Sequence, residues 1–259
     1  MSKLLSSGVV QGAGFLVGCV VFWEVVVRVL GVREFLFPAP TTVIAEIASY
    51  PKFFLTNALY TLMVTALGFA IALSLGVLLA IGIVYSRFLE NTLYSLLVAL
   101  NSIPKVALAP LFVIWLGTEI APKIAVAVTI AIFAIVVDTV LGLRSVDPET
   151  LNMARAARAN EWQILRKIRF PSALPSLFAG MKVAISFALV GALVGEFVAG
   201  NKGLGHAILL AQGQFDTPRV FAAILILGVM GTALFYLVDV IERYVLPWHV
   251  SHRGTRKAM

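Results

Sequence analysis

Charged side chains are scarce in this sequence, and one of them lies where it could bind a solute. Lys105 falls in the apolar segment NSIPKVALAP, between Pro104 and Pro110. Each proline removes a backbone donor and kinks or breaks a helix, and broken helices near the middle of a membrane often form solute sites. A cation at such a site favours an anion. We therefore predict a solute path at Lys105, with Asn101 and Ser102 beside it.

Two structural interpretations stay open beside this one. Lys105 could instead be paired with Asp138 or Glu196 and make no contact with a solute, because an ionisable group inside a membrane usually has a partner or a function. Glu196 follows Gly191 and Gly195. That spacing indicates close helix packing first, and a residue that gates the path second.

The other polar residues do not form the patterns that catalysis requires. His206, His249 and His252 are too scattered for a metal site. The sequence lacks a Gly-x-x-x-x-Gly-Lys-Ser/Thr loop, a Gly-x-Ser-x-Gly elbow and a His-Glu-x-x-His pair. We expect no catalytic residue, no metal ion and no cofactor held by this chain.

The composition places these residues in a membrane protein. Of 259 residues, 60% are hydrophobic and 13% are charged, whereas a soluble domain has about 25% charged residues. The chain therefore lacks the polar groups to cover its own surface. A single cysteine excludes a disulfide-stapled domain. A net charge of +7 would also suit a nucleic-acid-binding protein, so the positions of the basic residues decide between the two classes.

Apolar runs locate the membrane spans, each of which needs about 20 residues as a helix. Between Lys52 and Arg87 the sequence has 34 residues without a charge. The runs are continuous rather than alternating, which favours helices over barrel strands. Glu24 and Arg28, four residues apart with the acid first, predict a local ion pair. The predicted fold is an all-α integral membrane protein, one domain over 1–259, with six transmembrane helices at 11–30, 57–84, 93–117, 122–143, 175–198 and 219–241.

The basic residues orient these spans. With both termini in the cytoplasm, twelve Lys and Arg residues lie on the inside and five on the outside, as the positive-inside rule expects. The inside set is Lys3, Arg87, Arg144, Arg155, Arg158, Arg166, Lys167, Arg169, Arg243, Arg253, Arg256 and Lys257. The outside set is Arg33, Lys52, Lys123, Lys202 and Arg219. Because the basic residues are spread over several loops, a nucleic-acid partner is disfavoured.

One long cytoplasmic loop, 144–174, is predicted between the fourth and fifth spans. Asp147 and Pro148 are typical of an N-cap followed by the first helical residue. A short helix is expected through LNMARAARA, and a second through EWQILRKIR that stops at Pro171. The apolar face of the second helix is predicted to contain Trp162, Ile164, Leu165 and Ile168. From composition alone, this loop could equally lie on anionic lipid.

The segment ARAARANEWQILRKIRFPSALP resembles the "EAA" loop of permease subunits of binding-protein-dependent ABC importers. The pattern of that loop is Glu-Ala-Ala, three residues, Gly, nine residues, then Ile-x-Leu-Pro. The matching residues are Ala154, Ile168 and Pro171, and the departures are Asn152, Met153, Arg158 and Phe170. The segments FLFPAPTTV, NSIPKVALAPLFVIWLG, GLRSVDPE, ALPSLFAGMKVAISFALVGALVGEFVAG and GLGHAI extend the resemblance to the nitrate, sulfonate and taurine branch.

The resemblance implies a MetI-like fold in a bacterial inner membrane and import of a small anionic solute. It also implies an assembly of two permease chains, two cytoplasmic ATPase subunits and an extracytoplasmic binding protein. ATP and Mg would be bound by the ATPase, and a homodimer of permeases is favoured over a heterodimer. The loop would dock in a cleft of the ATPase. Its expected contact residues are Ala154, Ala157, Arg158, Glu161, Ile168 and Pro171.

Arg158 stands where the pattern has glycine, which would supply a left-handed backbone. Because that conformation costs another residue about 1–2 kcal/mol, we expect Arg158 to stay right-handed. Asn160 tolerates the conformation and is expected to form the turn instead. Glu161 is expected to replace the acid that Asn152 lacks.

Three other classes of protein were weighed against an ABC permease. A secondary transporter driven by an ion gradient would show internal repeats and acids near the midplane, and no repeat is evident. A membrane-embedded enzyme would need clustered nucleophiles or metal ligands. A membrane scaffold without transport activity is left open by the sequence.

Overall fold

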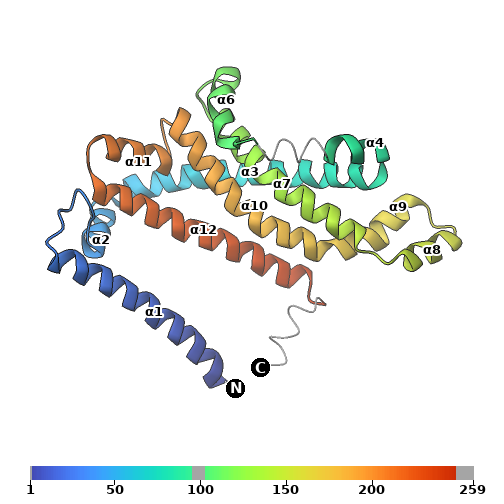
Figure 1. Ribbon diagram of the computed structural model, residues 1–259, viewed down its shortest axis with the longest axis horizontal. Helices are drawn as coiled ribbons and strands as arrows, with labels where there is room; N and C mark the ends of the chain where they lie inside the picture. The colour runs from blue at the N-terminus through green and yellow to red at the C-terminus, as the bar shows by residue number, and fades with distance from the viewer. Residues whose placement is uncertain (1, 95–102, 249–259) are drawn as a thin grey trace. The chain divides into compact units, whose positions relative to one another are not determined.

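The computed structural model describes the backbone of residues 2–94 and 103–248, and the side chains of residues 14–92 and 103–248. All regular elements in these ranges are helical (Figure 1). They are α1 Ser2–Val29, α2 Pro40–Ser49, α3 Pro51–Tyr85, α4 Arg87–Leu89, the π-helix η1 Glu90–Tyr94, the 3-10 helix η2 Lys105–Leu108, α6 Ala109–Leu116, α7 Ala121–Arg144, α8 Pro148–Ala156, α9 Glu161–Ile164, the π-helix η3 Leu165–Arg169, α10 Phe170–Ala199, α11 Leu204–Gly213 and α12 Thr217–Val245.

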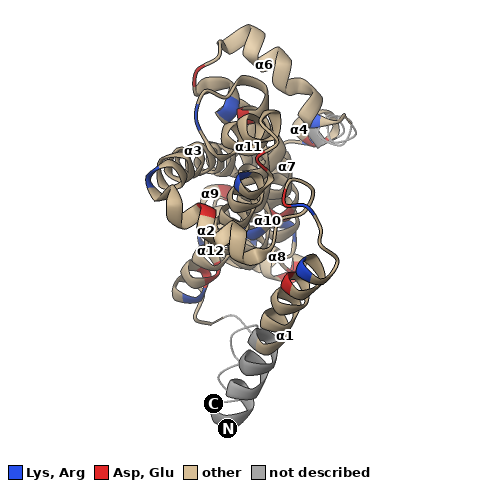
Figure 2. Ribbon diagram, turned by 90° about the vertical axis from the view of Figure 1, so that its left-hand side faces the viewer, with Lys and Arg blue, Asp and Glu red and all other residues tan. Residues whose placement is uncertain are grey.

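Four segments of the described chain are long and apolar enough to cross a membrane. They are α3, α7, α12 and the continuous segment 161–199, and they contain the second, fourth, sixth and fifth predicted spans. The ribbon of α3 is tan over most of its length in Figure 2, because residues 53–85 carry no charge. The first predicted span overlaps α1. The third combines η2 and α6 with residues 95–102, which lie outside the described ranges, so six crossings and cytoplasmic termini stay predictions.

The helices form two compact units. The first comprises Met1–Tyr60, Lys202–Val229 and Pro247–Met259, and the second comprises Thr61–Asn201 and Met230–Leu246. In the first unit, Arg219 bonds Glu46 at 2.7 Å and lies over the ring of Tyr50, with 4.8 Å to its centroid. The predicted pair of Glu24 and Arg28 is confirmed at 2.5 Å.

The second unit is built on close contact between α7 and α10. A Cβ atom on Gly191 would lie 2.5 Å from Ala127 Cα, and one on Gly195 would lie 2.7 Å from Lys123 Cα. Only glycine allows two helix backbones to approach this closely. The packing that the spacing of these glycines indicated is therefore present. The core beside it contains Ala72, Ala131, Ile135, Leu177, Ala184 and Ala188.

Pro171 does not stop a helix, contrary to the prediction. The chain stays helical from α9 through η3 into α10, and Pro171 lies in the first turn of α10. The π-turn immediately before it includes a bond from Phe170 N–H to the Leu165 carbonyl, five residues back. This wider turn accommodates a residue that cannot donate and that would crowd the preceding turn. The helical segment that contains the fifth predicted span therefore begins at Glu161 rather than near residue 175.

Candidate functional site

The loop between α7 and α10 contains α8, whose start agrees with the sequence prediction. Asp147 is the N-cap, and its side chain accepts a hydrogen bond from Glu149 N at 2.9 Å. Pro148 follows at the first helical position, where its missing N–H leaves no partner unsatisfied. In Figure 1, α8 and α9 project beyond the ends of α7 and α10. The second unit therefore presents a short polar helix at one end of two apolar ones.

Arg158 adopts the left-handed backbone with φ 60°, so the prediction that it would stay right-handed is wrong. Its N–H donates to the Arg155 carbonyl at 2.9 Å, and the next N–H, of Ala159, donates to the Ala154 carbonyl at 3.0 Å. These two bonds form a Schellman cap, in which the residue after the C-cap is left-handed. Two carbonyls at the end of α8 gain donors in this way, which offsets the strain at Arg158.

Asn160 does not form the turn, because it is the N-cap of α9 in extended conformation. Its side chain accepts from Gln163 N at 2.8 Å, and the Gln163 side chain accepts from Asn160 N at 2.9 Å. This reciprocal capping box needs an extended backbone at Asn160, so Asn160 does not adopt the left-handed conformation. Glu161 forms an ion pair with Arg155 at 3.1 Å. Its carboxylate thus connects the start of α9 to the end of α8 at the surface, where an ion pair contributes at most about 1 kcal/mol.

The six expected contact residues lie along this loop with different exposure. Ala157, Arg158 and Glu161 are exposed, whereas Ala154, Ile168 and Pro171 are half-buried. Trp162 was predicted to share an apolar face with Ile164, yet its side chain is 68% exposed and Ile164 is fully buried. The reason is that both residues lie within α9 and are two positions apart, which places their side chains on different sides of the helix.

Contacts at the base of the loop attach it to the long helices. Arg169 donates to the Leu143 carbonyl at 3.1 Å and lies over the ring of Tyr85, 5.5 Å from its centroid. The Tyr85 hydroxyl donates to the Glu161 carbonyl at 3.4 Å. The sequence analysis did not predict that Arg169 and Tyr85 attach the loop. The available signal was an aromatic residue, Tyr85, at the end of an apolar run.

Of the four predicted solute-path residues, the structure describes Lys105 and Glu196. Lys105 begins η2, and its Nζ lies 5.3 Å from the centroid of the Phe133 ring. Asn101 and Ser102 lie outside the described residues. Glu196 is fully buried, and its carboxylate accepts from the Thr61 hydroxyl at 2.8 and 3.0 Å. In this arrangement Glu196 belongs to the packed interior of the second unit.

A charged cluster between α10 and α12 was not predicted. Lys182 Nζ lies 2.5 Å from Asp239 and 2.6 Å from Glu242, and Arg243 lies 2.7 Å from Asp239. The side chains of Lys182, Asp239 and Glu242 are 19%, 14% and 8% exposed. The available signal was a cation in one apolar span and two acids, three residues apart, in another.

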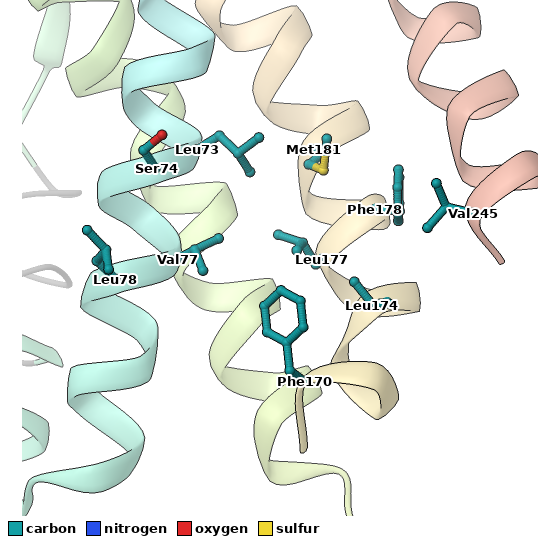
Figure 3. Close-up of a pocket in the computed structure, with 10 residues that line it drawn as sticks. All are labelled: Leu73, Ser74, Val77, Leu78, Phe170, Leu174, Leu177, Phe178, Met181 and Val245. Atoms are coloured by element: carbon teal, nitrogen blue, oxygen red, sulfur yellow. The ribbon is translucent and has the colours of Figure 1, made fainter. Parts of the chain in front are cut away.

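Two cavities of different character lie beside α10. The larger, about 520 Å³, is lined almost wholly by apolar side chains from α3 and α10 together with Val245, as Figure 3 shows. The smaller, about 380 Å³, lies between α10 and α12 near the charged cluster, and its lining is Ser186, Gly231, Thr232, Phe235 and Tyr236. The second cavity offers hydroxyl groups and aromatic rings, whereas the first offers a surface for apolar groups.

Comparison with known proteins relates this fold and loop to a transport family. The model of the binding-protein-dependent transport system inner membrane component matches residues 72–247. The formylaminopyrimidine transport permease protein ThiX of Halalkalibacterium halodurans is 35% identical over 90% of this chain and 94% of its own length. The riboflavin transport system permease protein RibX of Chloroflexus aurantiacus is 37% identical, over 89% and 87%. A putative aliphatic sulfonates transport permease protein, SsuC of Bacillus subtilis, is 29% identical, over 91% and 86%.

Solved structures share the fold at lower identity. An inward-facing MetNI methionine ABC transporter chain aligns with TM-score 0.61 and 23% identity, covering 73% of this chain and 93% of that one. An amino acid ABC transporter chain aligns with TM-score 0.64 and 18% identity, covering 77% and 97%. The all-helical MetI-like fold and the importer resemblance are thus confirmed. The chain belongs to the family of binding-protein-dependent transport system inner membrane components, the permease subunits of ABC importers.

Proposed function

We propose that the chain crosses a bacterial inner membrane six times with both termini in the cytoplasm, and pairs with a second copy of itself around a solute path. It holds no catalytic residue or cofactor. A separate ATPase binds ATP and Mg, and an extracytoplasmic binding protein delivers the solute. Reporter fusions after Arg87, within 199–215 and after Lys257 test the topology, and an external carboxyl terminus would contradict it.

One observation supports a role of this loop in coupling to the ATPase. α8 ends at a hydrogen-bonded cap, and from Glu161 onward the chain is helical without interruption to Ala199. A displacement of α9 by a bound ATPase would therefore be transmitted along α10, which packs on α7 through the glycines described above. The alternative of a loop that lies on lipid does not use this rigid connection.

The test places an acid on the expected docking side. Ala154→Glu keeps a good helix former but puts volume and an unpaired charge into the contact, which weakens it by several kcal/mol if the charge is fully buried there. We expect normal membrane insertion, loss of ATPase co-purification and loss of uptake. A loop on anionic lipid would lose only about 1 kcal/mol of attraction.

Arg158→Gly is the comparison in the same loop, because Arg158 is itself an expected contact residue but the pattern of the "EAA" loop has glycine at its position. It leaves the contact alanines in place and removes the strain of a left-handed Arg, so the loop should be more stable by about 1 kcal/mol and ATPase binding should persist. Retained ATPase binding and uptake in Ala154→Glu would contradict the coupling assignment.

The first candidate solute is a small anion of the nitrate, sulfonate or taurine kind. Lys105 supports it, because a cation in a helix broken at Pro104 suits an anion, and a relative is named for aliphatic sulfonates. We expect Lys105→Met to depress anion uptake while assembly and basal ATP hydrolysis persist. Unchanged uptake would refute the role, and failure to assemble would make Lys105 a structural residue.

The second candidate is a small nitrogen heterocycle. Two relatives with at least 35% identity are named for transport of formylaminopyrimidine and riboflavin, and the cavity between α10 and α12 is lined by aromatic rings and hydroxyl groups. Uptake of formylaminopyrimidine and of an aliphatic sulfonate by the same assembled importer distinguishes the two candidates.

A further inference from the structure

We propose that one face of α12, together with Lys182 and Ser186 of α10, lines the solute path, and that the cavity there holds a planar ring of the solute. The inference rests on the proposed transport function and adds to it a place and a chemical class. It concerns only the second unit, which contains all the residues involved.

The first observation is a polar face on a membrane helix. Thr232, Tyr236 and Asp239 follow one another at intervals of four and three residues, which places them on one side of α12, and Arg243 continues this side into the last turn of the helix. The side chains of Thr232 and Tyr236 are both exposed, that of Tyr236 to 60%. Polar and charged groups at membrane depth face a bundle interior or a water-filled cavity rather than lipid. This face is therefore a wall of an aqueous space.

The opposite side of α12 has another character. Leu237 is 55% exposed, and Ile241 is 42% exposed. Such apolar side chains suit contact with lipid. The contrast between adjacent residues of similar exposure, Tyr236 and Leu237, assigns the two sides to different surroundings.

The charged cluster connects this face of α12 to α10. Lys182 bonds Asp239 and Glu242, and its Nζ lies 5.8 Å from the centroid of the Phe235 ring. With Arg243 included, two cations balance two acids, so the cluster carries no formal net charge. A site beside it would select a solute by shape and hydrogen bonding rather than by overall charge.

The cavity lies near the middle of both helices and suits one planar polar ring. Its volume of about 380 Å³ falls at the lower end of small-molecule sites, which span about 300–1,000 Å³. Phe235 and Tyr236 offer ring surfaces with 6.0 Å between their centroids. Ser186 donates to the Lys182 carbonyl at 3.4 Å, and its oxygen can still accept a hydrogen bond.

Recognition of a ring here is compatible with recognition of an anion at Lys105, because one small molecule can carry a planar ring and an acidic group. The larger cavity is a poorer candidate for a polar solute. Its lining is almost wholly apolar, so a polar ring would lose hydrogen bonds to water there without replacement.

Thiol accessibility tests the wall in the assembled importer. Cys19, which is exposed, is first replaced by serine, and Tyr236→Cys is compared with the matched control Leu237→Cys in proteoliposomes. A charged, water-soluble thiol reagent should label Tyr236→Cys at least tenfold faster. Thr232→Cys is a second reporter of the same face and should behave like Tyr236→Cys.

Equal labelling of the two faces would overturn the inference. So would absence of labelling at both reporters, or a disulfide between two copies at Tyr236→Cys, which would make the face a contact between permease chains. ATPase co-purification with the Cys19→Ser background separates these outcomes from a failure of the proposed function, since it reports assembly alone.

The ring is tested by protection with two probes at equal concentration. Formylaminopyrimidine should slow labelling of Thr232→Cys at least fivefold, whereas methanesulfonate should not. Protection by both probes or by neither would refute a site for planar rings. Removal of the Tyr236 ring in Tyr236→Leu should abolish protection of Thr232→Cys, and Tyr236→Phe should keep most of it.

Discussion

Glu196 and Lys182 are both ionisable residues of α10, about four helical turns apart, and their surroundings differ in kind. Glu196 is fully buried, accepts two contacts from the Thr61 hydroxyl, and follows Gly195, which touches the α7 backbone. Lys182 is partly exposed, bridges two acids of α12 and lies beside a polar cavity. Similar residues in one helix thus hold a packed interior together in one place and border an open space in the other.

The difference lies in the neighbouring residues. Glycines at 191 and 195 allow the α7 backbone to lie against α10, whereas α12 presents hydroxyl groups and rings to a cavity beside α10 near Lys182. We expect substitutions near Glu196 to change stability alone, and substitutions near Lys182 to change transport as well.

The largest effect is expected from Gly195→Val. Its Cβ would lie 2.7 Å from Lys123 Cα, and because backbone cannot move aside, α7 and α10 would separate at a cost of about 3 kcal/mol or more. Folded protein recovered in detergent should fall sharply. The control is Gly228→Val, at a helical glycine with open space around its Cβ position; equal loss in both variants would argue against tight packing as the cause.

Lys182→Met should have the next largest effect. It leaves Asp239 and Glu242 without their shared cation, which destabilises a buried ion pair by about 3–5 kcal/mol. The ion pair of Asp239 with Arg243 reduces this loss of stability, so we expect about 3 kcal/mol. The loss is measured as a fall in melting temperature in detergent. Adding Asp239→Asn and Glu242→Gln should restore most of the loss; a triple variant as unstable as Lys182→Met would show that packing, not charge, is responsible.

Thr61→Val should have the smallest effect. It removes the hydroxyl that donates to Glu196 while keeping the volume, for a loss of about 1–3 kcal/mol. Thr65→Val is the control, because the buried Thr65 hydroxyl donates to the Thr61 carbonyl of its own helix rather than to a carboxylate. The melting temperature should fall further in Thr61→Val, with unchanged solute preference. Altered solute preference in Thr61→Val would instead indicate that Glu196 contributes to the solute path.

Sequence patterns predicted the features that depend on residues close together in the chain. The apolar runs gave four of the long helices, Asp147 and Pro148 marked the start of α8, and Glu24 and Arg28 formed their expected pair. Each of these rests on interactions within one or two helical turns. The resemblance of the 144–174 loop to the "EAA" loop also indicated the family.

The sequence by itself thus determined the membrane class, most spans and the loop, because hydrophobicity and capping act locally. The left-handed backbone of Arg158 was missed although the bonds of its cap are local, because glycine rather than arginine usually signals such a cap. The tertiary structure decided which buried polar groups are partners. It alone joined Thr61 to Glu196 and Lys182 to Asp239, residues 135 and 57 positions apart. Such partners are chosen by which helix faces meet, and that choice depends on packing across the whole unit rather than on any local pattern.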